Sequence, residues 1–135
     1  MKRKKILLVD DSETILMLEQ MILKDRPYDI ITANDGKEGV AKAEAEKPDL
    51  ILMDVVMWTM SGFEACRQIR KKEATKDIPI ILVTSEAGTE NIQTGFDSGC
   101  TDYISKPIKG PELLSRVEKY LAEEGSRPRN GRGEQ

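Results

Sequence analysis

Asp49-Leu50-Ile51-Leu52-Met53-Asp54-Val55-Val56-Met57 is the stretch that decides the fold of this chain. The run that begins at Leu50 is apolar until the acidic Asp54, which is typical of a strand buried on both faces of a parallel sheet. The Asp54 carboxylate is the first polar group at the carboxyl end of that strand, where parallel α/β sheets carry their functional sites. We therefore expect the chemistry of this protein to be centred on Asp54.

Along the rest of the chain, apolar runs of strand length alternate with longer amphipathic stretches of helical length. The expected strands are residues 6–9, 28–33, 50–54, 79–83 and 103–104, and the expected helices after the first are residues 37–47, 63–71, 91–98 and 112–121. This alternation is the pattern of βα units, and not of a helix bundle or a β-sandwich. The sequence therefore predicts an α/β fold built on a parallel sheet.

The first helix is expected to follow Asp10-Asp11-Ser12, where Ser12 or Asp11 can cap its free N–H groups. Pro27 lies beyond this helix and stops it. The apolar residues that recur at helical spacing, and so define its expected apolar face, are Ile15, Leu16, Leu18, Ile22 and Leu23.

The composition excludes several classes of function. The chain has 135 residues, enough for one hydrophobic core, and a net charge of −3, which disfavours general attraction to nucleic acid or anionic membranes. No apolar segment is long enough for a signal peptide or a membrane span, so we expect a cytoplasmic protein. The absence of histidine excludes a Ser-His-Asp triad and any His-ligated zinc site. Cys66 and Cys100 lack metal-ligand spacing and are expected to be reduced and structural.

The last residues differ in composition from the rest. Residues 125–135 contain no apolar side chain, so they cannot contribute to a core. We predict one domain over residues 1–123, followed by a disordered polar tail or truncated linker over residues 124–135.

A set of polar residues lies at the carboxyl ends of the expected strands. Its members are Asp10-Asp11 after the first strand, Asp54 at the third, Thr84-Ser85 at the fourth and Lys106 after the fifth. A parallel sheet brings these ends to one edge, so residues far apart in the sequence should form one polar site.

The residue types in this set indicate phosphoryl chemistry. Carboxylates crowded at one edge repel one another and raise each other's pKa unless a cation is bound, and oxygen ligands suit Mg²⁺. The Lys106 ammonium and the Thr84 hydroxyl can bind two oxygens of a phosphoryl group. Because an aspartate can serve as the nucleophile that accepts such a group, we predict that Asp54 does so.

These motifs resemble the receiver domain of two-component response regulators over about residues 4–122, and most of all the stand-alone, chemotaxis-type members. The resemblance rests on Leu8-Val9-Asp10-Asp11-Ser12, Met53-Asp54-Val55-Val56-Met57 with Ser61-Gly62, Val83-Thr84-Ser85, and Tyr103-Ile104-Ser105-Lys106-Pro107. Each motif alone is weak, but together, in this order and at these separations, they form a strong signal. The resemblance implies a flavodoxin-like, three-layer (βα)5 fold with a doubly wound parallel sheet of strand order 2-1-3-4-5.

The resemblance also implies a role for each residue of the site. Asp54 would be the phosphoacceptor, supplied by the phosphohistidine of a sensor histidine kinase or phosphotransfer protein, or by a small phosphodonor. Thr84 and Lys106 would bind the phosphoryl oxygens and complete the catalytic set. The implied ligands of Mg²⁺ are Asp10, Asp11, Asp54 and the backbone carbonyl of Val56.

The resemblance further implies how the signal leaves the domain. Tyr103 would turn inward when Thr84 moves toward the phosphoryl group, reshaping the surface made by the fourth helix, fifth strand and fifth helix. A downstream protein target would read that surface, with no membrane contact and no direct DNA binding within this chain. The Lys106–Pro107 peptide bond would be cis, as is common in the family.

Val56 and Trp58, which follow Asp54 in the sequence, depart from the family pattern. Trp58 stands where the family usually has proline, so the loop loses a fixed φ and gains a large aromatic side chain. Val56 has an apolar side chain that cannot position an attacking water, which predicts slow hydrolysis of the acyl phosphate.

Other interpretations of the same residues remain open. Asp10-Asp11 could be only a helix cap, Thr84 only a strand residue that caps the next helix, and Tyr103 only packing. A pseudo-receiver would bind its partner without phosphate. A phosphatase resembling the haloacid dehalogenase group would need a second carboxylate two residues after the nucleophile, where this chain has Val56. We therefore expect a signalling domain, not an enzyme, that catalyses only its own Mg²⁺-dependent phosphorylation and autodephosphorylation.

Overall fold

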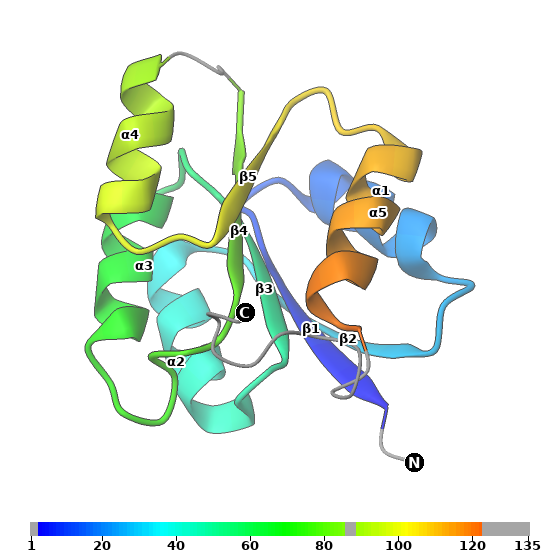
Figure 1. Cartoon of the computed structure of the whole chain (residues 1–135), viewed down its shortest axis with the longest axis horizontal. Helices are drawn as coiled ribbons and strands as arrows, with labels where there is room; N and C mark the ends of the chain where they lie inside the picture. The colour runs from blue at the N-terminus through cyan, green and yellow to red at the C-terminus, as the bar shows by residue number, and fades with distance from the viewer. Residues whose placement is uncertain (1–2, 86–88, 123–135) are drawn as a thin grey trace, which may run out of the picture.

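The computed structural model describes residues 3–85 and 89–122, and of residues 89–91 only the backbone. At its centre lies a five-stranded parallel sheet in the order β2-β1-β3-β4-β5 (Figure 1). The strands are β1 (Lys4–Val9), β2 (Tyr28–Ala33), β3 (Leu50–Asp54), β4 (Ile80–Thr84) and β5 (Asp102–Ser105). The predicted strand order is confirmed.

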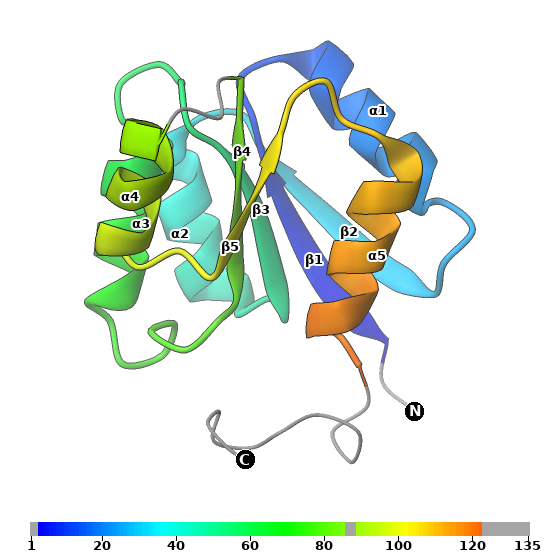
Figure 2. The same ribbon diagram turned by 45° about the horizontal axis from the view of Figure 1, so that its top comes forward.

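Helices cover both faces of this sheet, which makes three layers. The two that lie on one face are α1 (Glu13–Leu23) and α5 (Gly110–Tyr120) (Figures 1 and 2). The other face is covered by α2 (Gly36–Glu46), α3 (Gly62–Arg70) and α4 (Thr89–Asp97). The fold is therefore the flavodoxin-like (βα)5 architecture that the sequence predicted, and the four predicted helix ranges lie within two residues of those observed.

Each face of the sheet packs against its helices through a separate hydrophobic core. Along β1, Ile6 and Leu8 pack with residues of α1 and α5, whereas Leu7 and Val9 pack with residues of α2 and α3. Side chains alternate in this way because successive residues of a strand point to opposite faces. All five residues of β3 are buried, so its apolar run is explained by cover on both faces.

Side-chain oxygens cap three of the helices that follow strands. Ser12, Asp35 and Ser61 accept hydrogen bonds from the backbone N–H groups of Ile15, Glu38 and Glu64, respectively. Each bond satisfies an amide that has no partner inside the helix. The Ser12 cap matters for function because it starts α1 directly after Asp10 and Asp11.

The predicted apolar face of α1 is wrong in one respect. The residues of this helix that the structure buries are Leu16, Glu19 and Leu23, whereas Leu18 is 37% exposed. Positions 16, 19 and 23 form one stripe at helical spacing, and the carboxylic acid Glu19 occupies the middle of it. Hydrophobicity alone assigned Leu18 to the apolar face, but the position of the helix on the sheet places Glu19 there.

The predicted tail, residues 124–135, lies outside the described residues, so the domain boundary at 123 stays a prediction. Among the helices that are described, none is long and apolar enough to cross a membrane.

Candidate functional site

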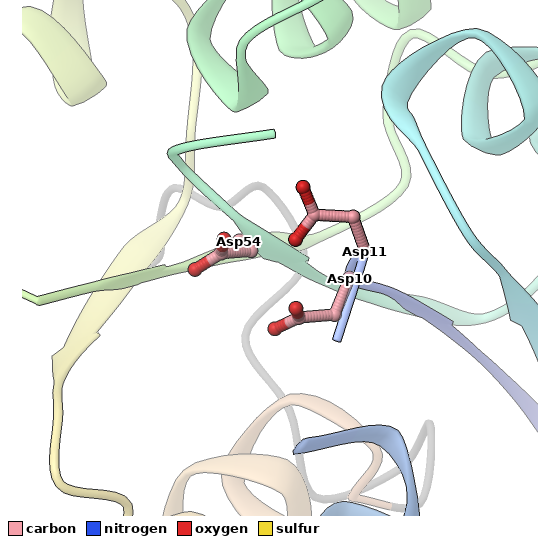
Figure 3. A group of neighbouring side chains, drawn as sticks. All are labelled: Asp10, Asp11 and Asp54. Carbon is pink, nitrogen blue, oxygen red and sulfur yellow. The ribbon is translucent and has the colours of Figure 1, made fainter. Parts of the chain in front are cut away.

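The register of the sheet brings the predicted site residues to one edge. Val9 pairs with Met53 across β1 and β3, so Asp10 and Asp11 emerge beside Asp54, the last residue of β3. One carboxylate oxygen from each of these three aspartates lies within 4.8 Å of the others. Figure 3 shows the three side chains next to one another where the two strands end. The predicted acidic cluster is therefore present.

Lys106 reaches the same place from the loop after β5. Its Nζ lies 2.9 Å from Asp54 Oδ1 and 4.0 Å from Asp10 Oδ2. The backbone N–H of Lys106 donates a hydrogen bond of 2.7 Å to the carbonyl of Thr84, which ties the loop to the end of β4. The Lys106–Pro107 peptide bond is cis, as the resemblance implied.

Asp10 is the most deeply buried member of the cluster, with 1% of its surface exposed. Its Oδ1 accepts a hydrogen bond of 2.9 Å from the backbone N–H of Ser12, while its buried Oδ2 has no hydrogen-bond partner within the described chain. Burial, with smaller contributions from the charges of Asp54 and Asp11, raises the pKa of Asp10 to about 6, although the hydrogen bond from Ser12 and the charge of Lys106 act to lower it. An unsatisfied buried oxygen beside other carboxylates is a position that a cation would stabilise.

Burial also raises the pKa of Asp54, although its hydrogen bond and ion pair with Lys106 act in the opposite direction. Burial by itself would lower the pKa of Lys106, but the hydrogen bond and charge of Asp54 outweigh it, so that pKa is raised. The contact with Asp54 therefore favours the ammonium form of Lys106.

The loop after β3 folds back against the end of that strand, where the backbone N–H of Gly62 donates a hydrogen bond of 2.8 Å to the carbonyl of Val55. A Cβ atom on Gly62 would overlap the carbonyl oxygen of Asp54, so only glycine allows the loop to return this close to the strand. Trp58 is 75% exposed, and its backbone N–H donates a hydrogen bond of 3.2 Å to Asp11 Oδ2. Because proline has no N–H group, the residue usual in the family could not make this bond. Val56 is 72% exposed beside Asp54.

The two residues predicted to act as a switch lie on neighbouring strands. Thr84 ends β4 directly after Val83, the residue that pairs with Asp54, and it is 5% exposed. Tyr103 is partly buried on β5, with its ring edge-to-face with that of Phe96 on α4 at a centroid distance of 6.2 Å. Phe96 is a contact of Tyr103 that the sequence did not reveal.

A family profile described as the response regulator receiver domain matches residues 6–118 of this chain. The chain belongs to this family. Receiver domains signal through phosphorylation and are not classical enzymes, and they interact with histidine kinases or phosphotransfer proteins. Receiver domains bind Mg²⁺ at an acidic pocket, and this receiver has an acidic cluster formed by Asp10, Asp11 and Asp54.

Individual relatives agree with this assignment. The alkaline phosphatase synthesis transcriptional regulatory protein PhoP of Bacillus subtilis is 42% identical over 118 residues, which cover 87% of this chain and 48% of PhoP. The chain thus spans about half the length of that relative. The structure of the chemotaxis response regulator CheY4 of Vibrio cholerae is 36% identical with a TM-score of 0.84, covering 89% of this chain and 100% of CheY4.

A second structural neighbour carries a metal. The receiver domain of the sensor histidine kinase PA1611 of Pseudomonas aeruginosa PAO1 has a magnesium ion coordinated in its active site cleft. It is 30% identical to this receiver with a TM-score of 0.83, over 90% of this chain and 100% of that chain.

The sequence analysis missed Glu19. This residue lies close enough to the site for the charges of Asp10, Asp54 and Lys106 to affect its pKa. Burial, and to a smaller extent the charges of Asp10 and Asp54, raise the pKa of Glu19 to about 8 against the opposing charge of Lys106. The signal that could have revealed it is its position between Leu16 and Leu23 at helical spacing.

Proposed function

We propose that this receiver accepts a phosphoryl group on Asp54 from the phosphohistidine of a sensor histidine kinase or phosphotransfer protein, and passes the signal to a downstream protein. The observation that carries this proposal is the Lys106 ammonium held 2.9 Å from Asp54 inside a cluster of three carboxylates. A plain strand-end aspartate would need neither the lysine nor its acidic neighbours.

The residues present fit a magnesium ion. Asp10, Asp11 and Asp54 would hold Mg²⁺ together with the backbone carbonyl of Val56, and the unsatisfied Asp10 Oδ2 is an oxygen that such an ion would use. When bound, Mg²⁺ neutralises the carboxylates and the oxygens of the incoming phosphoryl group. The magnesium in the PA1611 receiver supports this assignment.

In the proposed transfer, an oxygen of the Asp54 carboxylate attacks phosphorus. An O–P bond forms as the P–N bond of the phosphohistidine breaks, and the departing imidazole keeps the bonding electrons and takes up a proton. Lys106 moves its hydrogen bonds onto a phosphoryl oxygen, and the Thr84 hydroxyl donates to another. Asp54, Thr84 and Lys106 are therefore the catalytic residues of the proposal. The transfer needs no histidine as a general base, and this chain has none.

The proposed signal passes through Thr84 and Tyr103 to the face formed by α4, β5 and α5. Phosphorylation adds a charge of about −1.5 to −2 beside Thr84. Movement of Thr84 would let Tyr103 turn inward, away from its edge-to-face contact with Phe96 on α4. A downstream protein would read the changed face, and the net charge of −3 gives this chain no general affinity for DNA.

Binding without phosphate is the alternative function. It has less support because a pure interaction domain needs no carboxylate cluster, and Asp10, Asp11, Asp54, Thr84 and Lys106 are all present at one edge. An aspartate-dependent phosphatase has less support still, because exposed Val56 stands where a second carboxylate would be needed.

Incubation with phosphoramidate and Mg²⁺, followed by the mass of the intact protein, tests the proposal. The expected result is a gain of one phosphoryl group that is absent in Asp54→Ala and absent when EDTA replaces Mg²⁺. If the unaltered chain gains no mass under saturating donor while it stays folded, phosphate-independent binding is the better account.

A further inference from the structure

Tyr103 lies on the same face of the sheet as Thr84 but outside both hydrophobic cores. It pairs with Leu82 across β5 and β4, and Thr84 follows two residues later on β4. Paired residues share a face, as do residues two apart on one strand, so these three side chains point toward the layer of α2, α3 and α4. Leu82 packs into the core on that side, whereas Tyr103 is a member of neither core. Core packing therefore does not fix the position of the Tyr103 ring.

The backbone of Tyr103, by contrast, is held by side chains at the edge strand β5. Its N–H donates a hydrogen bond of 2.8 Å to Asp102 Oδ1, and its carbonyl accepts one of 2.7 Å from the Arg116 guanidinium of α5. Arg116 also forms an ion pair with Asp102 at 3.1 Å, and the Tyr120 hydroxyl donates a hydrogen bond of 2.7 Å to Asp102 Oδ2. A rearrangement at Tyr103 is therefore confined mainly to its side chain.

Phe96 lies on an anchored end of α4. Its carbonyl accepts a hydrogen bond of 3.0 Å from the N–H of Gly99, and the Ser98 hydroxyl donates one of 2.7 Å to the carbonyl of Gly95. A Cβ atom on Gly95 would lie only 3.2 Å from Leu82 Cδ1, so glycine allows this end of α4 to pack close to β4. The helix therefore holds the Phe96 ring at a defined place beside the sheet.

The rings of Phe96 and Tyr103 join these two fixed backbones. Their centroids are 6.2 Å apart and their planes are at 87°, which is the favourable edge-to-face geometry. A pair of this kind changes an equilibrium constant by roughly two- to tenfold. Phe96 is 45% exposed and is a member of neither core, so filling a core does not explain its ring. The contact with Tyr103 gives that ring a role.

We propose that Phe96 is a positioning residue for Tyr103, whose ring it holds against α4 and so keeps from turning inward toward Thr84. This inference rests on the proposed function, in which phosphorylation of Asp54 is accompanied by that inward turn. Because the ring contact exists only while Tyr103 stays against α4, it favours the unphosphorylated conformation. Phe96 thereby sets how readily the receiver enters its signalling conformation.

The first measurement follows the Tyr103 side chain in the absence of any phosphoryl group. The three-bond coupling between its backbone nitrogen and its Cγ reports which χ1 rotamers are populated. We expect one rotamer in the unaltered chain and averaging between rotamers in Phe96→Ala. Phe96→Tyr, which keeps the ring, should restore the single rotamer.

The second measurement is the affinity for beryllofluoride, a mimic of the phosphoryl group, in the presence of Mg²⁺. A ligand of the inward conformation binds more tightly when that conformation is more populated. We therefore expect Phe96→Ala to bind beryllofluoride roughly two- to tenfold more tightly than the unaltered chain. In a chain that also carries Tyr103→Ala, the same substitution should have no effect, because the ring through which Phe96 acts is gone.

Leu18→Ala is the matched control. It removes a partly exposed apolar side chain, 37% exposed on α1, and should change neither measurement. An unchanged affinity in Phe96→Ala overturns the positioning role while the proposed function stands. An equal gain in affinity with and without Tyr103 overturns it as well, because Phe96 would then act by another route.

Failure of the proposed function gives a different result. In that case the unaltered chain binds no beryllofluoride and gains no mass from phosphoramidate, and the rotamers of Tyr103 test the contact on their own. Averaging in Phe96→Ala that Phe96→Tyr reverses would support Phe96 as the residue that positions Tyr103. A single Tyr103 rotamer in every variant would overturn that role too.

Discussion

At the scale of single residues, the site combines a reactive carboxylate with neighbours that control its surroundings. Asp54 is 5% exposed, and the loop that follows it carries the exposed side chains of Val56 and Trp58. Val56 is strongly exposed and carries no polar atom in its side chain. The lifetime of the proposed acyl phosphate therefore depends on whether residue 56 can help a water molecule to attack.

Val56→Asn should shorten that lifetime. An amide at this exposed position can orient a water toward phosphorus, so we expect the phosphate to be lost roughly tenfold faster. The measurement is the decay of phosphorylated protein, followed by intact mass after removal of the donor. Met21→Asn, at an exposed position on α1, is the matched control. An unchanged decay rate in Val56→Asn would show that the apolar side chain does not limit hydrolysis.

At the scale of elements, α1 carries a carboxyl group where its packing calls for an apolar residue. Because the folded-state pKa of Glu19 is raised from 4.5 to about 8, the folded protein holds a proton that the unfolded chain gives up between these values. Stability from this group is therefore fully present below about pH 4.5 and is lost as pH rises to about 8.

Glu19→Leu should accordingly stabilise the fold, and more so at alkaline pH. We expect its advantage in the free energy of unfolding to grow by a few kcal/mol, on the order of the pKa difference, between about pH 4.5 and about pH 8. Urea unfolding at the two pH values measures the difference, with Glu13→Gln as control. An advantage that does not change with pH would mean that Glu19 is not held in its neutral form.

The loop after β3 is the element that connects the acidic cluster to a spectroscopic signal. Trp58 is the single tryptophan of the chain, and its backbone N–H binds Asp11 Oδ2, one of the proposed magnesium ligands. We expect a cation on Asp11 to compete with this hydrogen bond and so to change the surroundings of the indole.

We therefore expect the emission of Trp58 to change during titration with Mg²⁺. Asp11→Asn should move the midpoint to roughly tenfold or more higher Mg²⁺, because it removes a charged ligand from the site. The prediction is contradicted if calorimetry shows that the protein binds Mg²⁺ but the emission stays constant across a saturating titration. Mg²⁺ binding would then leave the surroundings of Trp58 unchanged.

At the scale of the whole molecule, the site is formed by residues from the ends of three different strands of the sheet. Asp10 and Asp11 follow β1, Asp54 ends β3, and Lys106 follows β5. The repulsion among the carboxylates and their burial oppose folding, and a bound cation removes that cost. Metal binding and global stability are therefore linked.

Mg²⁺ should raise the temperature of unfolding. At a concentration about 100-fold above its Kd, a ligand adds about 2.7 kcal/mol, which corresponds to roughly 10 °C for a domain of this size. Calorimetry with Mg²⁺ and with EDTA measures the shift. Below the Asp10 pKa of about 6, protons compete with the metal, so the shift should shrink as pH falls through this value. No shift at neutral pH would count against a magnesium site.

The sequence by itself determined the elements of this protein and the edge of the sheet at which its candidate site lies. The buried run before Asp54 marks a central strand because local apolar patterns reflect burial, and polar residues at strand ends converge in any parallel sheet. The strand order 2-1-3-4-5 followed from the resemblance, which the sheet confirms. These features depend on short-range pattern and on the direction of the strands, both of which are visible in the sequence.

Only the tertiary structure decided which side chains meet. The rotation of α1 on the sheet buries Glu19 and exposes Leu18, contrary to their hydrophobicity. The contact of Phe96 with Tyr103, the hydrogen bond from Trp58 to Asp11 and the 2.9 Å between Lys106 and Asp54 likewise arise from packing between distant elements. Hydrophobic periodicity predicts the buried face of a helix only to within about one position. Burial of one carboxyl group costs less free energy than the packing of the whole helix against the sheet contributes. The Glu19 carboxyl beside the charges of Asp10, Asp54 and Lys106 is the result of that balance.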